Sequence, residues 1–246
     1  MNESKRALRC NQHVYQRIRL LVFDLDYLVF DCSLIKTQAL RQGLISLAEA
    51  IPHNAPLPDK LDVQEAFLDQ GVSWIDRLEL GLDQDAMSNL RQACSIHENR
   101  LIESGAGTLY ADLENFLLNC QTMGITAALG AEATREYLLA VADKHQLDNL
   151  FQISLCTEEF GAGNTEEMLE EIMQIAEVHP SETIVLGTRA RAFEAAHAAD
   201  MKAIGCGWGL RNRGGLKEAD LQVAAISQLS AVLKQIDDRL CSTNLE

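Results

Sequence analysis

The stretch that decides the fold is Leu20–Val29, LLVFDLDYLV, an apolar run that contains two aspartates, Asp24 and Asp26. Such a run is typical of a strand that is buried on both faces of a parallel sheet. Ligands of these sheets bind beyond the carboxyl ends of the strands. Two carboxylates there can bind a hard cation such as Mg²⁺, or supply a nucleophile and a general acid or base. For an Asp-x-Asp pair taken alone, a solvated strand end is the alternative.

From about residue 109 onward, helical and strand patterns alternate. Four helical stretches each lead into an apolar stretch, so that strands are predicted at 125–129, 150–155, 182–187 and 202–209. This alternation predicts crossover connections and a parallel sheet with helices on both faces. We therefore expect an α/β fold, a three-layer sandwich around a parallel Rossmann-like sheet.

The block between the first strand and this alternating region has helical periodicity and no convincing strand. Helices are predicted at 34–51, 74–82 and 87–105, with a proline-containing break at 52–59. An insertion at this point lies over the strand ends, where a lid would close. The expected division is a basic leader at 1–19, a core at 20–32 and 108–236, a helical cap at 33–107, and a tail at 237–246.

Composition narrows the class of protein. The chain has 246 residues and a net charge of −15, which argues against a nucleic-acid partner. No apolar run is long enough for a transmembrane segment, and the seven cysteines are scattered, so we expect a cytoplasmic protein with reduced thiols. The leader is positively charged, unlike the chain as a whole, because it has five Lys or Arg residues and one Glu. It is either a frayed solvated end or a contact for an acidic partner or a membrane.

Several stretches, in the right order, resemble a known family. They are the first-strand motif from Asp24 to Cys32 and the segments LYADLENFLLNCQTMGI, LDNLFQISLCTEEFGAG and EAAHAADMKAIGCGWG. Over about residues 20–235 the chain resembles the haloacid dehalogenase superfamily, in particular its phosphoglycolate phosphatase and beta-phosphoglucomutase branch. The resemblance implies that Asp24 is the nucleophile that forms an aspartyl phosphate, and that Asp26 is the general acid and base.

Other motif positions depart from the family pattern. A phosphate-binding hydroxyl is replaced by Gly130, the charge-neutralising lysine by Asn164, and the magnesium-binding acids by Thr188 and Ala192. The Gly-Thr turn of the first motif is Tyr27-Leu28. Phosphoryl transfer depends mainly on positioning and charge stabilisation, and losing one such donor costs on the order of 3 kcal/mol. We expect these losses together to reduce hydrolysis to background.

Two functions remain open. The first is a catalytically degenerate protein of this fold, without a cofactor, that binds an unknown protein partner or a ligand as a regulator or assembly factor. The second is a phosphatase that uses Asp24 and Mg²⁺ on a small phosphorylated metabolite. Magnesium at Asp24 and Asp26 is expected to bind weakly or not at all, and we expect Arg189 to take the place of the cation. Arg135 and Lys144 are further candidates to reach the site from neighbouring loops.

Overall fold

The computed structural model describes residues 17–47, 58–161, 164–210 and 213–242. Most of the basic leader and the last four residues of the tail lie outside the described residues. In the described part of the chain, no helix combines the length and the apolar composition that crossing a membrane requires.

A six-stranded parallel sheet forms the centre of the molecule, in the order β5-β4-β1-β6-β7-β8. Strand β1 lies inside the sheet, where Phe23 is in register with Leu129 on one side and Leu186 on the other. The strands are β1 (Leu20–Phe23), β4 (Thr126–Ala131), β5 (Ile153–Cys156), β6 (Thr183–Gly187), β7 (Lys202–Cys206) and β8 (Leu221–Val223). The predicted three-layer α/β fold is confirmed.

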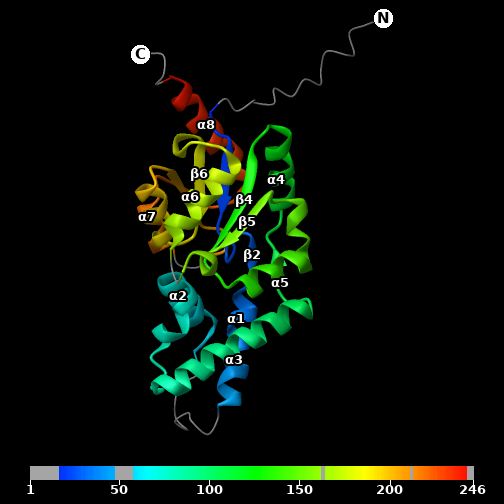
Figure 1. Cartoon of the computed structure of the whole chain (residues 1–246), viewed down its shortest axis with the longest axis vertical. Coiled ribbons are helices and arrows are strands. Elements are labelled where there is room, and N and C mark those ends of the chain that lie inside the picture. The colour runs from blue at the N-terminus through cyan, green and yellow to red at the C-terminus, as the bar shows by residue number, and fades with distance from the viewer. Residues whose placement is uncertain (1–16, 48–57, 162–163, 211–212, 243–246) are drawn as a thin grey trace, which may run out of the picture.

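Helices cover both faces of this sheet (Figure 1). Helices α4 (Leu113–Thr122) and α5 (Arg135–His145) lie on one side, and α6 (Thr165–Ala176) and α7 (Ala190–Ala198) on the other. The chain ends in α8 (Leu229–Ser242). Side chains alternate across β1, because successive residues of a strand point to opposite faces.

The helices of the insertion gather at one end of the molecule, beyond the carboxyl ends of the strands (Figure 1). They are α1 (Ser33–Ser46), α2 (Lys60–Gln70), the 3₁₀ helix η1 (Gly71–Leu78) and α3 (Gln84–Glu103). A short antiparallel pair, β2 (Phe30–Asp31) and β3 (Thr108–Leu109), brackets this insertion. Within the described part of 33–107 there is no strand. The exact domain boundaries stay a prediction.

Three local predictions need correction, and two elements were not predicted. Strand β1 ends at Phe23, and the rest of the apolar run forms a turn in which Tyr27 has a φ of 60°. The helix expected at 74–82 is the 3₁₀ helix η1, which ends at Leu78 before two residues of positive φ, Glu79 and Gly81. The last predicted strand ends at Cys206 instead of continuing to residue 209. Helix α2 and strand β8 were not predicted, since neither has strong periodicity.

Candidate functional site

Asp24 and Asp26 follow directly after β1, and both are buried. The Asp24 backbone N–H still donates to the Leu186 carbonyl at 3.0 Å, so the backbone there remains bonded to β6. The Leu25 N–H donates to Asp24 Oδ1 at 2.8 Å. The sheet thus holds both carboxylates at the edge where the cap helices meet the core.

A buried guanidinium joins Asp24 to a second carboxylate. Arg189 Nη2 and Nε donate to Asp24 Oδ2 at 2.8 and 3.2 Å, and Nη1 donates to Glu132 Oε2 at 2.8 Å. Arg189 follows β6, and Glu132 follows β4, so all three residues belong to strand ends of one sheet. The Thr165 hydroxyl donates to the other Glu132 oxygen at 3.0 Å. We call Asp24, Arg189 and Glu132 the core ion cluster.

Asp26 belongs to a second cluster that reaches into the cap. Lys36 Nζ, from α1, lies 3.1 Å from Asp26 Oδ2 and 3.4 Å from Glu98 Oε2 on α3. The Tyr137 hydroxyl, from α5, donates to Asp26 Oδ1 at 2.7 Å. We call Asp26, Lys36 and Glu98 the cap–core ion cluster.

The ring of Phe67, on α2, lies over both clusters. Its centroid is 4.8 Å from Lys36 Nζ and 5.1 Å from the guanidinium carbon of Arg189. It also contacts the ring of Tyr27, with 5.4 Å between centroids. Cations over an aromatic face are attracted by its quadrupole. Because Phe67 is itself buried, the cap places an apolar lid on the two aspartates.

Burial changes the titration of these groups. Desolvation raises the pKa of Asp24 from 3.8 to about 6, although Arg189 opposes the shift. Burial also raises the pKa of Glu98 above its usual value. For Lys36 burial acts in the lowering direction, but Asp26 and Glu98 outweigh it and the net pKa is raised. The two bases therefore stay among four buried acids. Asp24 and Glu98 hold protons more tightly than usual mainly because they are buried, and the neighbouring carboxylates add to the shift.

The predicted motif positions lie around the clusters but contribute few of their contacts. Asn164 caps α6, since its side chain accepts from the Glu167 N–H at 3.2 Å. A side chain at Gly130 would meet Met168 and Val22 before it met a carboxylate. Thr188 is buried with no hydrogen-bond partner for its hydroxyl, and Ala192 is buried in α7.

The turn that replaces the family's Gly-Thr pair packs against another loop. Tyr27 and Leu28 are fully buried, and the Trp208 indole N–H donates to the Leu28 carbonyl at 2.9 Å. A Cβ at Gly209 would lie only 2.1 Å from the Tyr27 carbonyl oxygen. Gly209 therefore permits a close approach of the two backbones.

Of the three cationic residues expected to reach the site, Arg189 does so. Arg135 is ion-paired with Glu159, and Lys144 donates to the Glu103 carbonyl at 3.0 Å. Neither has a contact with Asp24 or Asp26 among those the structure shows.

The sequence did not point to Lys36, Glu98, Glu132 or Tyr137. Glu132 had a usable signal, because it lies one residue past the end of β4, beside the end of β1. The predicted strand ended at residue 129, and the family resemblance placed the phosphate-binding position at Gly130. Lys36, Glu98 and Tyr137 lie on helices, where only the tertiary fold shows that they face the aspartates.

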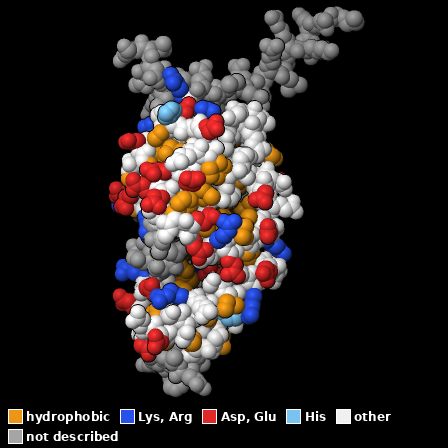
Figure 2. Space-filling view, viewed as in Figure 1, with side chains coloured by type: hydrophobic (Ala, Val, Ile, Leu, Met, Phe, Trp, Pro, Cys, Tyr) orange, Lys and Arg blue, Asp and Glu red, His pale blue; other side chains and the backbone are white. Residues whose placement is uncertain are grey.

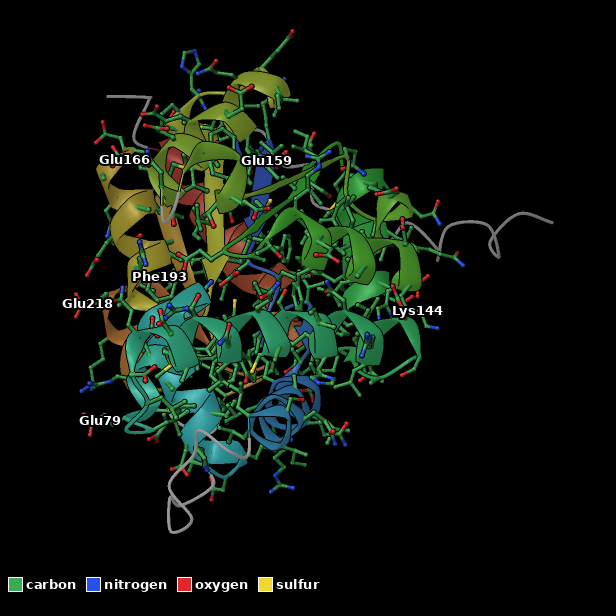
Figure 3. The ribbon with its side chains drawn as sticks, turned by 60° about the horizontal axis from the view of Figure 1, so that its bottom comes forward. Glu79, Lys144, Glu159, Glu166, Phe193 and Glu218 are labelled. Carbon is green, nitrogen blue, oxygen red and sulfur yellow. The ribbon has the colours of Figure 1, made fainter. Side chains whose placement is uncertain are left out.

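Two hollows adjoin the clusters. A cavity of about 190 Å³ lies between cap and core and is lined by residues that include Asp26, Lys36, Glu98, Trp74 and Tyr137. A wider groove of about 720 Å³ lies between α2, η1 and the loop after β6. Viewed from the cap end, α3 crosses in front of the core, and Glu79 marks the outer edge of the cap (Figure 3).

This arrangement, a parallel sheet with a helical insertion after the strand that carries Asp-x-Asp, can be compared with known proteins. The family model for haloacid dehalogenase-like hydrolases matches residues 21–206. The chain belongs to the haloacid dehalogenase-like hydrolase family. No curated protein sequence matches the chain.

Solved structures of haloacid dehalogenase-like proteins share the fold. A predicted phosphoglycolate phosphatase from Haemophilus somnus has a TM-score of 0.73 at 14% identity, covering 88% of this chain and 98% of its own. A putative haloacid dehalogenase-like hydrolase from Bacteroides fragilis has a TM-score of 0.73 at 19% sequence identity. The match covers 86% of this chain and 99% of that protein. CbbY from Rhodobacter sphaeroides, solved in complex with phosphate, has a TM-score of 0.71 at 14% sequence identity. The match covers 86% of this chain and 96% of that protein. At these identities the likeness shows the fold alone.

Proposed function

We propose that this chain is a catalytically inactive member of the haloacid dehalogenase-like hydrolase family, which acts by binding a protein or a ligand, as a regulator or assembly factor. The observation that carries the proposal is the core ion cluster. The Arg189 guanidinium lies between Asp24 and Glu132, and the Phe67 ring covers it.

The position of Asp24 argues against its use as a nucleophile. A nucleophilic carboxylate needs an oxygen that can approach the phosphorus of a substrate. Here Oδ2 accepts from two Arg189 nitrogens and Oδ1 accepts from the Leu25 N–H. Attack by Oδ2 would have to give up charge-assisted bonds, which are about twice as strong as neutral ones, and attack by Oδ1 would compete with the backbone bond from Leu25.

The surroundings of Asp26 likewise oppose general acid catalysis. A general acid must carry the proton that it gives to the leaving group. Asp26 faces the Lys36 ammonium and accepts from the Tyr137 hydroxyl. Protein partners thus occupy both carboxylate oxygens, and neither is free to exchange a proton with a leaving group.

The donor set does not suit Mg²⁺. This ion requires about six oxygen ligands in octahedral geometry. Asp24 and Asp26 are each paired with a cationic side chain, and within the described residues no cluster of three or more metal-binding side chains occurs. We propose that Arg189 and Lys36 supply the positive charge that the two aspartates need.

A second candidate, a phosphatase for a small phosphorylated metabolite, is favoured by the two retained aspartates at the end of β1. For that activity the cap would have to move Phe67 away, and a phosphate would have to displace Glu132 from Arg189. Guanidinium groups bind phosphate well, so the two candidates differ in whether this exchange takes place.

A phosphatase assay separates them. The full chain and Asp24→Asn are incubated with p-nitrophenyl phosphate and phosphoglycolate in the presence of Mg²⁺. The proposal predicts equal, background rates for both proteins. Turnover of about 1 s⁻¹ or more that is lost in Asp24→Asn would establish the phosphatase instead.

The binding role is tested separately at the groove of about 720 Å³. Large clefts with convergent polar groups are the usual binding sites of proteins, and this groove is lined by Glu65, Arg77 and Arg191. Pull-downs from native lysate are compared for the full chain, Glu65→Lys and the exposed-face control Glu114→Lys. A specific partner that is lost only with Glu65→Lys supports this surface. Equal capture by all three places binding elsewhere.

A further inference from the structure

One segment of the core is rich in acidic residues, two of which pair with arginines from outside the segment. Residues 145–188 contain nine Asp or Glu residues and no Lys or Arg. Many of these acids lie on and around α6, where Figure 2 shows acidic side chains gathered over α6 and α7. In Figure 3, Glu166 marks the first turn of α6. This face therefore carries a strong negative potential, with no basic residue of its own segment to offset it.

A groove of about 440 Å³ runs along the second half of α6. Its lining combines apolar side chains with an acidic rim: Glu170, Met173, Gln174, Glu177, Val178 and His179. Glu170 and Glu177 are exposed, Met173 is nearly buried, and Val178 is half-buried. An apolar floor between carboxylates suits a segment that carries both apolar and basic side chains.

The described chain begins against α8, where the Arg17 N–H donates to Asp237 Oδ1 at 2.9 Å, and two residues later it lies beside this groove. The Arg19 N–H donates to the Glu182 carbonyl at 2.9 Å, and Arg19 Nη1 lies 3.7 Å from Glu182 Oε2. The same carboxylate accepts from the backbone N–H of His179, which lines the groove, at 3.0 Å. The start of the described chain and the end of the groove thus share one carboxylate.

We propose that the basic leader of this chain docks into the α6 groove of the same molecule. The leader contains Lys5, Arg6 and Arg9 around Leu8, which matches the acidic rim and the apolar floor. Seven residues lie between Arg9 and Arg17, which makes eight steps along the chain. At roughly 3.3 Å per step, an extended chain spans about 26 Å between them. Helix α6 has 12 residues and is about 18 Å long, so the leader reaches the whole groove. The docked leader shields this face from basic partners.

Methyl NMR of methionine in the full chain tests the docking. The wild type is compared with a variant that carries Lys5→Glu, Arg6→Glu and Arg9→Glu. We expect the Met173 resonance to shift between the two, while Met123, at the end of α4, stays in place. Raising salt to roughly 0.5 M should move the wild-type Met173 signal towards that of the variant, because exposed charges are then screened. An unchanged Met173 signal in both comparisons overturns the proposal.

Zero-length coupling of amines to carboxylates identifies the occupant. Lys5 is the sole lysine of the leader, and we expect its crosslinks within one chain to Glu170, Glu171 or Glu177. The double variant Glu170→Lys/Glu177→Lys should lose the salt-dependent Met173 shift, whereas Glu114→Lys should keep it. Crosslinks that appear only in dimers would show that the leader of a second copy occupies the groove. Crosslinks from Lys5 to other parts of the chain would show that the leader does not bind in the groove. Either result contradicts docking within one molecule.

Discussion

The two ion clusters differ in what they connect. The core ion cluster joins three strand ends of one sheet, whereas the cap–core ion cluster joins the sheet to α1 and α3 of the cap. Both place one base between two acids and meet under Phe67. The core ion cluster therefore holds the strand ends in place, and the cap–core ion cluster holds the cap against them.

Their surroundings differ as well. Lys36 borders the cavity of about 190 Å³ together with both of its acids, so water can enter when this cluster is disturbed. Arg189 is 3% exposed, and beside it the space next to Asp24 and Glu132 holds only about 10 Å³. An unpaired Asp24 therefore finds little water to replace its partner, whereas Glu132 also borders the cavity of about 190 Å³.

The largest expected effect follows removal of the core cation. Arg189→Met leaves Asp24 and Glu132 buried without their base, and breaking a buried pair in this way costs about 3–5 kcal/mol. Urea unfolding at neutral pH measures the loss. Arg191→Met is the matched control, since this arginine is 4.0 Å from Glu132 and half exposed, and it should cost about 1 kcal/mol or less. Equal losses in the two variants would show that Arg189 is not the key cation.

A smaller loss, about 2–3 kcal/mol, is expected for Lys36→Met, because Asp26 keeps the Tyr137 hydroxyl and water can reach the cavity. This variant should also loosen the cap, so limited proteolysis within 58–103 should accelerate relative to wild type. In Arg189→Met, proteolysis should not accelerate preferentially within the cap. A cap that is protected equally in both variants would contradict the distinction between the clusters.

The third prediction concerns pH. With a pKa of about 6 in the folded chain against 3.8 unfolded, Asp24 binds its proton more tightly in the folded state. Its contribution to stability is therefore fully present below pH 3.8 and is lost as the pH rises through 6. The full shift corresponds to roughly 3 kcal/mol. Unfolding curves between these pH values should show this decline in wild type and a flatter profile in Asp24→Asn. Parallel profiles would mean that the Asp24 pKa is not raised.

The smallest effect is expected for Tyr137→Phe. The change removes one hydrogen bond to Asp26 and keeps the ring against which Lys36 packs. Water from the adjoining cavity can replace the hydroxyl, so we expect a loss of about 1–2 kcal/mol by urea unfolding. A loss as large as that of Lys36→Met would show that the hydroxyl, rather than the ammonium, holds Asp26.

The fold was largely predictable because its signals are local. A strand that is apolar on both faces, followed by alternating helices and strands, specifies a parallel sheet, and several family-like stretches fix the order. The elements that were missed or mistaken have weak local signals. Helix α2 follows a proline-rich break, and η1 has helical periodicity but winds as a 3₁₀ helix.

The site was less predictable, because its partners come from five separate elements. The role of Arg189 could be predicted from the sequence, because two carboxylates at a strand end require a cation and the neighbouring strand end carries one. Lys36 and Glu98 are 62 residues apart and are brought together only by the packing of α1 against α3. Gly43 permits that packing, because a Cβ there would lie 2.9 Å from Leu90. No pattern within either helix reveals this contact.

Calorimetric titration of the wild-type chain with Mg²⁺ tests most directly the central claim, that protein cations have replaced the metal. The account predicts no binding heat at millimolar Mg²⁺, and the same result for Asp24→Ala. Binding at millimolar concentration or tighter in wild type that disappears in Asp24→Ala would contradict it, because the metal would then displace Arg189 from its carboxylate.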